Sequence, residues 1–278
     1  TAKLYCAMAV NPEFARSPEN PALIEKKGLP LFAVPTTAGT GAEATPNAIL
    51  YHRQKKQKMG IVSRKMIADT VILDGEMTAG LPKALAASTG FDALSHAMES
   101  FVSKKANPYS DMFALEAMRL IFKSLVPACR DNLADARQDM LLASFYAGVC
   151  LVTASTHVVH AMAYPLGGQY HVAHGESNYA IFTGVMKEYM RHKADGEIAV
   201  MNSYLADLLG CGTDVVYERL EELLNRVLPK KALREYGTTQ EDLPEWARSV
   251  IDNQQRLLHN SFIPMTEELV LKIYQDLY

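Results

Sequence analysis

Cysteine is scarce in this sequence, and the few cysteines form no recognisable pattern. They include no Cys-x-x-Cys pair, so we expect neither a disulfide framework nor a cysteine-bound zinc site. Reduced thiols in a cytoplasmic protein are the simpler interpretation. The residues concerned are Cys6, Cys129, Cys150 and Cys211.

Long apolar runs and an excess of basic residues are also missing. No run reaches the roughly 20 residues that cross a bilayer, and no signal peptide is visible. With a net charge of −3, the chain lacks the excess of basic residues that is typical of nucleic-acid-binding proteins. We therefore expect neither a membrane nor a nucleic acid as a partner.

Internal repeats and low-complexity tracts are absent, which argues against a helical solenoid. What the sequence does contain is the composition of an ordinary globular protein, with 49% hydrophobic and 21% charged residues. Its 278 residues are enough for one large or two ordinary domains with a substantial core.

The pattern of apolar residues divides the chain into two parts. Residues 1–76 mix a helix with extended segments: the helix covers 1–10, a strand covers 31–35, a hairpin joins 47–52 to 58–63, and a last strand covers 67–73. Residues 77–278 show only helical spacing. The predicted helices there are 83–103, 110–129, 137–163, 177–192, 197–209, 213–228, 241–259 and 266–277.

Asp92 and His96 stand four residues apart in the first of these helices. That spacing places both side chains on one helix face, where they can bind one cation from the same side. His160 lies near the end of the apolar segment 140–163, which we expect Pro165 and the following glycines to end. His174, 14 residues later (174 − 160), is then expected to approach from a loop.

Other interpretations of these residues remain open on spacing alone. An Asp and a His at this spacing often form only a surface hydrogen bond. His157 and His171, each three residues before a candidate ligand, are alternative ligands. Glu99, on the same helix as Asp92, either orients a ligand or serves as a structural ion-pair residue.

The motifs as a whole resemble those of the iron-dependent (group III) alcohol dehydrogenases. The matching stretches are Gly-x-Asp-Ala-x-x-His-Ala-x-Glu from Gly90, His-Ala-x-x-x-Pro-Leu-Gly from His160, and the pair His174-Gly175. The resemblance implies a dehydroquinate synthase-like fold, in which an α/β remnant of a Rossmann-like nucleotide-binding domain (1–76) precedes an all-α metal-binding domain (77–278). It also implies a chain that begins well inside a family member. The implied ligands of Fe(II), with Zn(II) as the alternative, are Asp92, His96, His160 and His174.

The segment after the first strand, Thr-Thr-Ala-Gly-Thr-Gly-Ala-Glu, is rich in glycine and small hydroxyl residues. Such stretches expose backbone N–H groups to a phosphate, although many are plain turns. The resemblance implies that this segment lies along NAD, with NADP also possible. Lys58 would then lie near the ribose, unless it is only a solvated surface residue. The implied cofactor residues are Thr36, Thr37, Gly39, Thr40 and Lys58.

Tyr164 occupies a position where many relatives carry a histidine near the nicotinamide. A phenol can relay a proton, but its ordinary pKa near 10 makes it less effective at neutral pH. Because the resemblance implies that this position lies near the nicotinamide, Tyr164 is nevertheless our candidate catalytic residue.

The resemblance implies a metal-dependent alcohol dehydrogenase that interconverts a primary alcohol and an aldehyde, and we expect a homodimer. Stretches around Lys105, after His160 and from Gln254 resemble the 4-hydroxybutyrate dehydrogenase branch, which implies oxidation of 4-hydroxybutyrate to succinate semialdehyde. Lys105 and Arg256 are the candidates for binding the substrate carboxylate. The alternatives are a general short-chain alcohol dehydrogenase and a non-catalytic helical metal-binding fragment. A His-Asp phosphohydrolase is disfavoured because the sequence has no His-Asp dipeptide.

Overall fold

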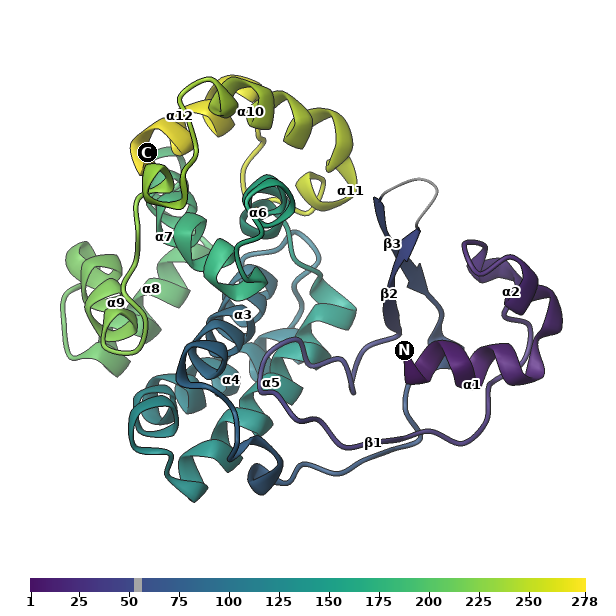
Figure 1. Cartoon of the computed structure of the whole chain (residues 1–278). Coiled ribbons are helices and arrows are strands. Elements are labelled where there is room, and N and C mark those ends of the chain that lie inside the picture. Colours follow the sequence, from purple (N-terminus) through teal and green to yellow (C-terminus); the bar gives the residue numbers. More distant parts are fainter. Residues whose placement is uncertain (53–56) are drawn as a thin grey trace.

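The computed structural model describes the backbone of residues 1–52 and 57–278, and the side chains of residues 1–50 and 59–278. The N-terminal part lies to the right in Figure 1, beside a larger helical body. It begins with helices α1 (Ala2–Val10) and α2 (Pro12–Arg16). Its strands form two separate pairs, one parallel and one antiparallel.

Strands β2 (Asn47–His52) and β3 (Gln57–Val62) form the antiparallel hairpin that the sequence predicts. Strands β1 (Phe32–Ala33) and β4 (Thr70–Val71) pair in parallel over only two residues each. The strands predicted over 31–35 and 67–73 are therefore much shorter than expected. The extended chain around them finds no further ladder partner among the described residues, and a strand requires one.

The helical body is organised around α3 (Lys83–Phe101), which lies at its centre (Figure 1). Every residue from Gly90 to Phe101 is buried, and α3 packs against α4, α5 and α7. Such all-round burial matches a helix rich in alanine and serine, whose small side chains allow close packing on every face. The other helices are α4 (Pro108–Val126), α5 (Ala134–Ala154), α6 (Val158–Gln169), α7 (His174–His192), α8 (Glu197–Leu209), α9 (Val216–Asn225), α10 (Asp242–Asn253), α11 (Gln255–Leu258) and α12 (Glu267–Leu277).

Each part of the chain has its own hydrophobic cluster. The larger cluster belongs almost entirely to the helices, while the smaller one lies under α1 and the hairpin. The division at residue 76 itself stays a prediction. The buried residues of the smaller cluster are Leu4, Ala7, Phe14, Ile24, Ala48, Ile61 and Met66.

The single helix predicted over 137–163 is wrong, because the chain bends by 110° between α5 and α6. Ser155 ends α5 with φ 66° and ψ 165°, a conformation that an α-helix cannot contain. The helix predicted over 241–259 is likewise divided, into α10 and α11. Among the described residues, no single helix is long and apolar enough to cross a membrane; only α5 and α6 taken together meet that test.

The expectation that Pro165 and the glycines stop the helix after His160 is also wrong. Helix α6 continues through Pro165 to Gln169. A proline inside a helix removes one hydrogen bond and costs about 3 kcal/mol. Burial of Met162, Ala163 and Leu166 in the core offsets that cost.

Candidate metal centre

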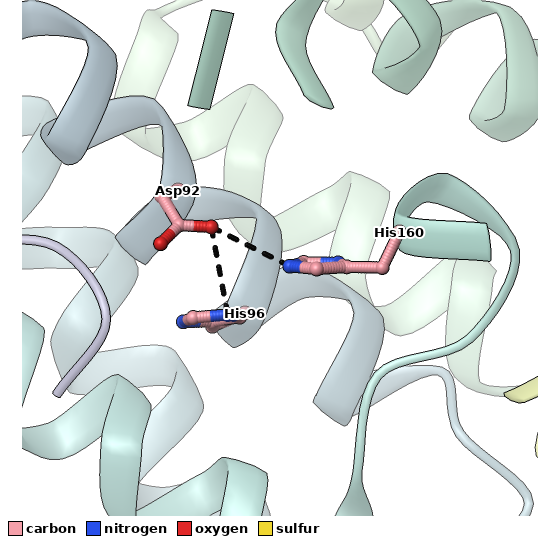
Figure 2. Close-up of side chains that lie close together, drawn as sticks. All are labelled: Asp92, His96 and His160. Carbon is pink, nitrogen blue, oxygen red and sulfur yellow. Dashed lines mark ion pairs between the residues drawn. The ribbon is translucent and has the colours of Figure 1, made fainter. Parts of the chain in front are cut away.

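Helix α3 brings Asp92 and His96 together, as their spacing predicts. His96 Nε2 lies 3.5 Å from Asp92 Oδ1, and both side chains are buried. Figure 2 shows the two side chains projecting from one helix toward the same point. The alternative of a surface hydrogen bond is excluded, because neither residue is at the surface.

Two further histidines approach the same oxygen atom of Asp92. His160, on α6, places Nε2 at 3.4 Å from Oδ1, and His174 places Nε2 at 3.5 Å. Among the described residues, ligand atoms of Asp92, His96 and His160 all lie within 4.8 Å of one another. His174 joins them from the exposed side, with 47% of its side chain accessible.

The spacing of these atoms fits a divalent ion. A tetrahedral ion with ligand bonds of about 2.1 Å separates any two ligand atoms by about 3.4 Å. The three distances to Asp92 Oδ1 are 3.4 to 3.5 Å. One carboxylate with three imidazoles is a donor set that suits Fe(II) or Zn(II).

His174 reaches the cluster from the first residue of α7, not from a loop as the sequence suggested. The next residue, Gly175, makes this approach possible. A Cβ atom at that position would lie only 1.7 Å from the backbone oxygen of Ser88 on α3. The backbone N–H of Glu176 donates to the Ser88 hydroxyl at 3.2 Å. The start of α7 is thus docked directly on α3.

Burial and the neighbouring charges shift the pKa values of the side chains in this cluster strongly. Burial alone would raise the pKa of Asp92, but the surrounding imidazoles hold it well below its ordinary range. Burial, together with the neighbouring imidazoles, lowers the pKa of His96 to about 4, so this ring is neutral at pH 7. Burial opposes a charge on His160 too, yet Glu99 and Asp92 raise its pKa to about 9.

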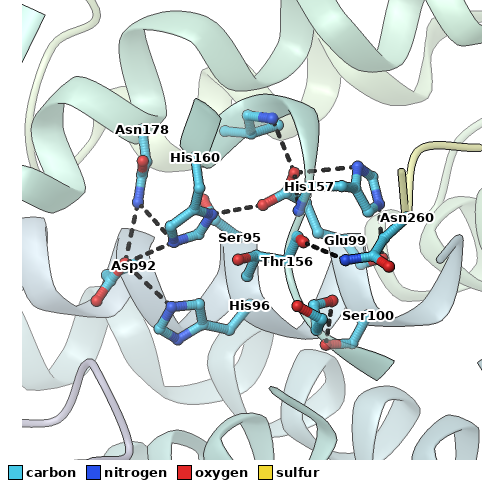
Figure 3. Close-up of polar contacts among 12 residues, drawn as sticks. Asp92, Ser95, His96, Glu99, Ser100, Thr156, His157, His160, Asn178 and Asn260 are labelled. Carbon is cyan, nitrogen blue, oxygen red and sulfur yellow. Dashed lines mark hydrogen bonds and ion pairs between the residues drawn. The ribbon is translucent and has the colours of Figure 1, made fainter. Parts of the chain in front are cut away.

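Glu99 holds the far side of His160, as Figure 3 shows. Its Oε2 lies 2.5 Å from His160 Nδ1, which leaves Nε2 directed at Asp92. Glu99 is completely buried, and burial would raise its pKa, but His157 and His160 lower it. Of the two interpretations of Glu99, the orienting one agrees with these contacts.

The alternative ligands His157 and His171 do not join the described cluster. His157 is fully buried and contacts Glu99 instead, with Nε2 at 2.8 Å from the Glu99 carbonyl oxygen and Nδ1 at 3.2 Å from Oε1. His171 is exposed and adopts a positive φ of 55°.

Asn178 is a residue of the site that sequence reasoning missed. Its Nδ2 donates to Asp92 Oδ1 at 2.9 Å and lies 3.2 Å from His160 Nε2. It follows His174 by four residues on α7, so the same helical spacing that singled out Asp92 and His96 would have found it. Its Oδ1 is buried without a partner among the described residues.

The glycine- and threonine-rich segment lies against the metal-site helix. A Cβ atom on Gly39 would meet the Thr89 side chain of α3 at 2.8 Å, so Gly39 permits this close approach. Thr36 and Thr40 are exposed and Thr37 is half-buried, which leaves their hydroxyls available to a ligand. The side chain of Lys58, the remaining candidate, lies outside the described residues.

Tyr164 lies one turn after His160 on α6 and is 42% exposed. Its ring is nearly parallel to that of His174, with the centroids 6.5 Å apart. Burial raises the pKa of Tyr164, which Arg256 lowers only in part. The phenol therefore keeps its proton at neutral pH beside the exposed edge of the cluster.

Two protein-family models together match most of the chain. The model described as Fe-containing alcohol dehydrogenase family, C-terminal, matches residues 86–278, and the model described as Iron-containing alcohol dehydrogenase matches residues 1–75. The chain belongs to the iron-containing alcohol dehydrogenase family. The resemblance of the metal motifs, the fold class and the assignment to an oxidoreductase family are thereby confirmed.

Relatives in the iron-containing alcohol dehydrogenase family are longer than this chain. It is 40% identical to the 4-hydroxybutyrate dehydrogenase of Clostridium kluyveri, over 91% of its own length and 69% of the relative. A 1,3-propanediol oxidoreductase structure matches with a TM-score of 0.83 at 30% identity, over 91% and 67% of the two chains. The sulfoacetaldehyde reductase of Bifidobacterium kashiwanohense in complex with NAD+ matches with a TM-score of 0.80 at 30% identity, over 90% and 65%. The chain thus spans about two thirds of their lengths.

Proposed function

We propose that the protein carrying this chain is a metal-dependent alcohol dehydrogenase that transfers hydride reversibly between NAD and a primary alcohol or aldehyde. The observation that supports this most is the meeting of three imidazole nitrogens around one Asp92 oxygen, at 3.4 to 3.5 Å. The proposed ligands of a divalent ion, Fe(II) by the family name, are Asp92, His96, His160 and His174.

When bound, the ion would supply Lewis-acid polarisation of the substrate oxygen. The protein side chains prepare the site for it. Glu99 fixes the ring of His160, and burial keeps His96 neutral and ready to bind. Tyr164 keeps its proton at neutral pH because of its raised pKa, so we assign it the role of a hydrogen-bond donor to the substrate oxygen.

The segment from Thr36 to Thr40 is our proposed nicotinamide-cofactor contact. It packs on α3 at Thr89, one turn before Asp92, so a cofactor along it would lie near the metal ligands. We propose NAD rather than NADP, because the structure of the related sulfoacetaldehyde reductase is a complex with NAD+. Lys58 remains part of this proposed set. The expected dimer and cytoplasmic location stay predictions.

For the substrate we propose 4-hydroxybutyrate, oxidised to succinate semialdehyde. The identity of 40% to a relative named for this substrate supports it. A substrate whose far end is a carboxylate needs a cation some distance from the metal, and arginine suits a carboxylate best because it can bind both oxygens.

Arg256 is favoured over Lys105 as this cation. Helix α11, which carries Arg256, packs against α6 and hence against the helix of His160 and Tyr164. The charge of Arg256 acts on Tyr164, whose pKa burial raises and Arg256 lowers. Within the described part of the chain, its guanidinium makes no ion pair. Lys105, which is exposed like Arg256, lies instead in the connection after α3.

The test compares kcat/KM for 4-hydroxybutyrate with kcat/KM for 1-butanol, which has the same chain length but no carboxylate. Loss of a charge-assisted contact costs about 1.5–3 kcal/mol, or roughly a ten- to hundredfold preference. Replacing Arg256 by Gln should abolish most of that preference. Lys105→Gln is the matched control and should preserve it.

Two outcomes would contradict parts of this proposal. Equal use of 1-butanol and 4-hydroxybutyrate would mean that the carboxylate is not bound, and the general short-chain alcohol dehydrogenase would be the better description. A preference that Lys105→Gln abolishes and Arg256→Gln preserves would move the carboxylate contact to Lys105.

A further inference from the structure

The connection between α5 and α6 is strained at the point that sets the direction of His160. Ser155 has φ 66° and ψ 165°, in a region that is essentially restricted to glycine. A residue held there costs about 1–3 kcal/mol and persists only where the surroundings enforce it. Helix α6 begins three residues later at Val158, so this turn determines where His160 points.

The surroundings that enforce the turn converge on Glu99. Its Oε1 accepts hydrogen bonds from the backbone N–H groups of His157 at 3.1 Å and Val159 at 2.8 Å. Its other carboxylate oxygen holds the ring of His160. One carboxylate therefore ties the backbone of the turn to the ligand that follows it.

The ring of His157 fixes Glu99 in turn. A carbonyl oxygen can only accept, so His157 Nε2 carries the hydrogen and donates to the Glu99 backbone oxygen at 2.8 Å. Nδ1 then accepts from the Tyr189 hydroxyl at 3.1 Å, and that hydroxyl lies 3.2 Å from Ser261 Oγ. All these side chains are fully buried. Burial also lowers the pKa of His157, which agrees with a neutral ring.

We propose that His157 is a positioning residue of the metal centre, which locks the strained turn to Glu99 and so presents His160 to Asp92. A side chain that merely filled space would need no polar partners, whereas His157 uses both ring nitrogens. The chain of contacts runs from the C-terminal segment at Ser261 to the proposed ligand. This inference rests on the ligand set proposed above.

Metal affinity tests this role without relying on catalysis. Co(II) is titrated into the purified, metal-free protein in competition with a chelator, and the visible absorption of bound Co(II) reports the ligand geometry. His157→Leu should weaken Co(II) binding by about 10- to 100-fold and change the spectrum, as loss of a ligand's support does. His157→Gln keeps an N–H donor for the Glu99 carbonyl and should recover part of the affinity.

Tyr189→Phe is a milder test in case His157→Leu fails to fold. It removes only the hydroxyl that donates to His157, and it should weaken Co(II) binding several-fold. Tyr217→Phe is the matched control, because it removes another buried tyrosine hydroxyl, which donates to Asn202 at 2.6 Å away from Glu99. The control should lower thermal stability similarly and leave Co(II) affinity unchanged.

The outcomes separate this inference from the ligand assignment. Asp92→Ala should abolish tight Co(II) binding; if it does not, the proposed ligand set is wrong. If Asp92→Ala abolishes binding while His157→Leu binds Co(II) with the parent affinity and spectrum, His157 only fills space and the inference is overturned. It is equally overturned if Tyr189→Phe and Tyr217→Phe weaken binding to the same extent.

Discussion

His174 differs from the other proposed ligands in its exposure. It is 47% accessible, whereas Asp92, His96 and His160 are buried. His174→Ala should therefore fold normally and yet reduce metal retention at least tenfold, because one of four donors is lost. Metal content after dialysis, measured by elemental analysis, checks this.

His171→Ala is the control for that experiment, because His171 is exposed and lies three residues before His174. It should retain metal like the parent. Full metal content in His174→Ala, with a loss in His171→Ala, would assign the fourth ligand to His171.

At the scale of the helix, Gly175 decides whether α7 can reach α3. Gly175→Ala would bring a methyl group to 1.7 Å from the Ser88 carbonyl, so the start of α7 must move away. We expect a loss of about 1–3 kcal/mol or more in the free energy of unfolding, together with weaker metal binding through His174. Urea unfolding and Co(II) titration measure the two effects.

Gly168→Ala offers the matched control, since a Cβ atom there meets nothing within 4 Å. Gly168 lies inside α6, where alanine is preferred to glycine by roughly 0.5–1 kcal/mol. This variant should be slightly more stable than the parent. A Gly175→Ala protein as stable as Gly168→Ala would mean that α7 does not dock on α3 as described.

The elements that the sequence predicted well are those whose sequence signals lie within the element itself. Helix α8 has the bounds predicted for it, 197–209, and the hairpin of β2 and β3 agrees within one residue at each end. The pair Asp92 and His96 was visible for the same reason, because both residues lie within one turn of helix.

The features that the sequence did not predict depend on contacts between distant residues. The break after α5 occurs at Ser155-Thr156-His157, which contains neither glycine nor proline, and its support comes from Glu99 on another helix. Helix α6 runs through Pro165 because its other face is buried. Periodicity describes one helix at a time and carries no information on such partners.

For the molecule as a whole, Glu188 connects the C-terminal helix to the helical body. Its side chain, on α7, is only 4% exposed. Glu188 Oε2 forms ion pairs with Arg191 Nη1 at 2.6 Å and with Nζ of Lys272, on α12, at 3.4 Å. Burial would raise its pKa, but these cations hold it below the ordinary value. Glu188→Gln should reduce the free energy of unfolding at pH 7 by about 1–3 kcal/mol, because charged hydrogen bonds are lost.

The sign of the pH dependence follows from that lowered pKa. The stabilisation by Glu188 is present above the pKa of an unfolded glutamate, about 4.3, and is lost as pH falls through the lower folded value. The difference between parent and Glu188→Gln in urea unfolding should therefore shrink below about pH 4.3. Glu222→Gln, which removes an exposed ion pair with Arg219, should change stability by less than about 1 kcal/mol. A difference between parent and Glu188→Gln that is unchanged in acid would contradict the role of the charge.

The meeting of three helices at one Asp92 oxygen also sets the order in which folding and metal loading can occur. Asp92 and His96 are close in sequence, but the next donor, His160, follows 64 residues later (160 − 96). Tight binding must therefore wait until α6 and α7 have docked on α3. An ion that binds only the folded chain stabilises it by about 2.7 kcal/mol at a hundred times its Kd. We predict that these late contacts form after the folding barrier, so that the ion slows unfolding rather than speeds folding.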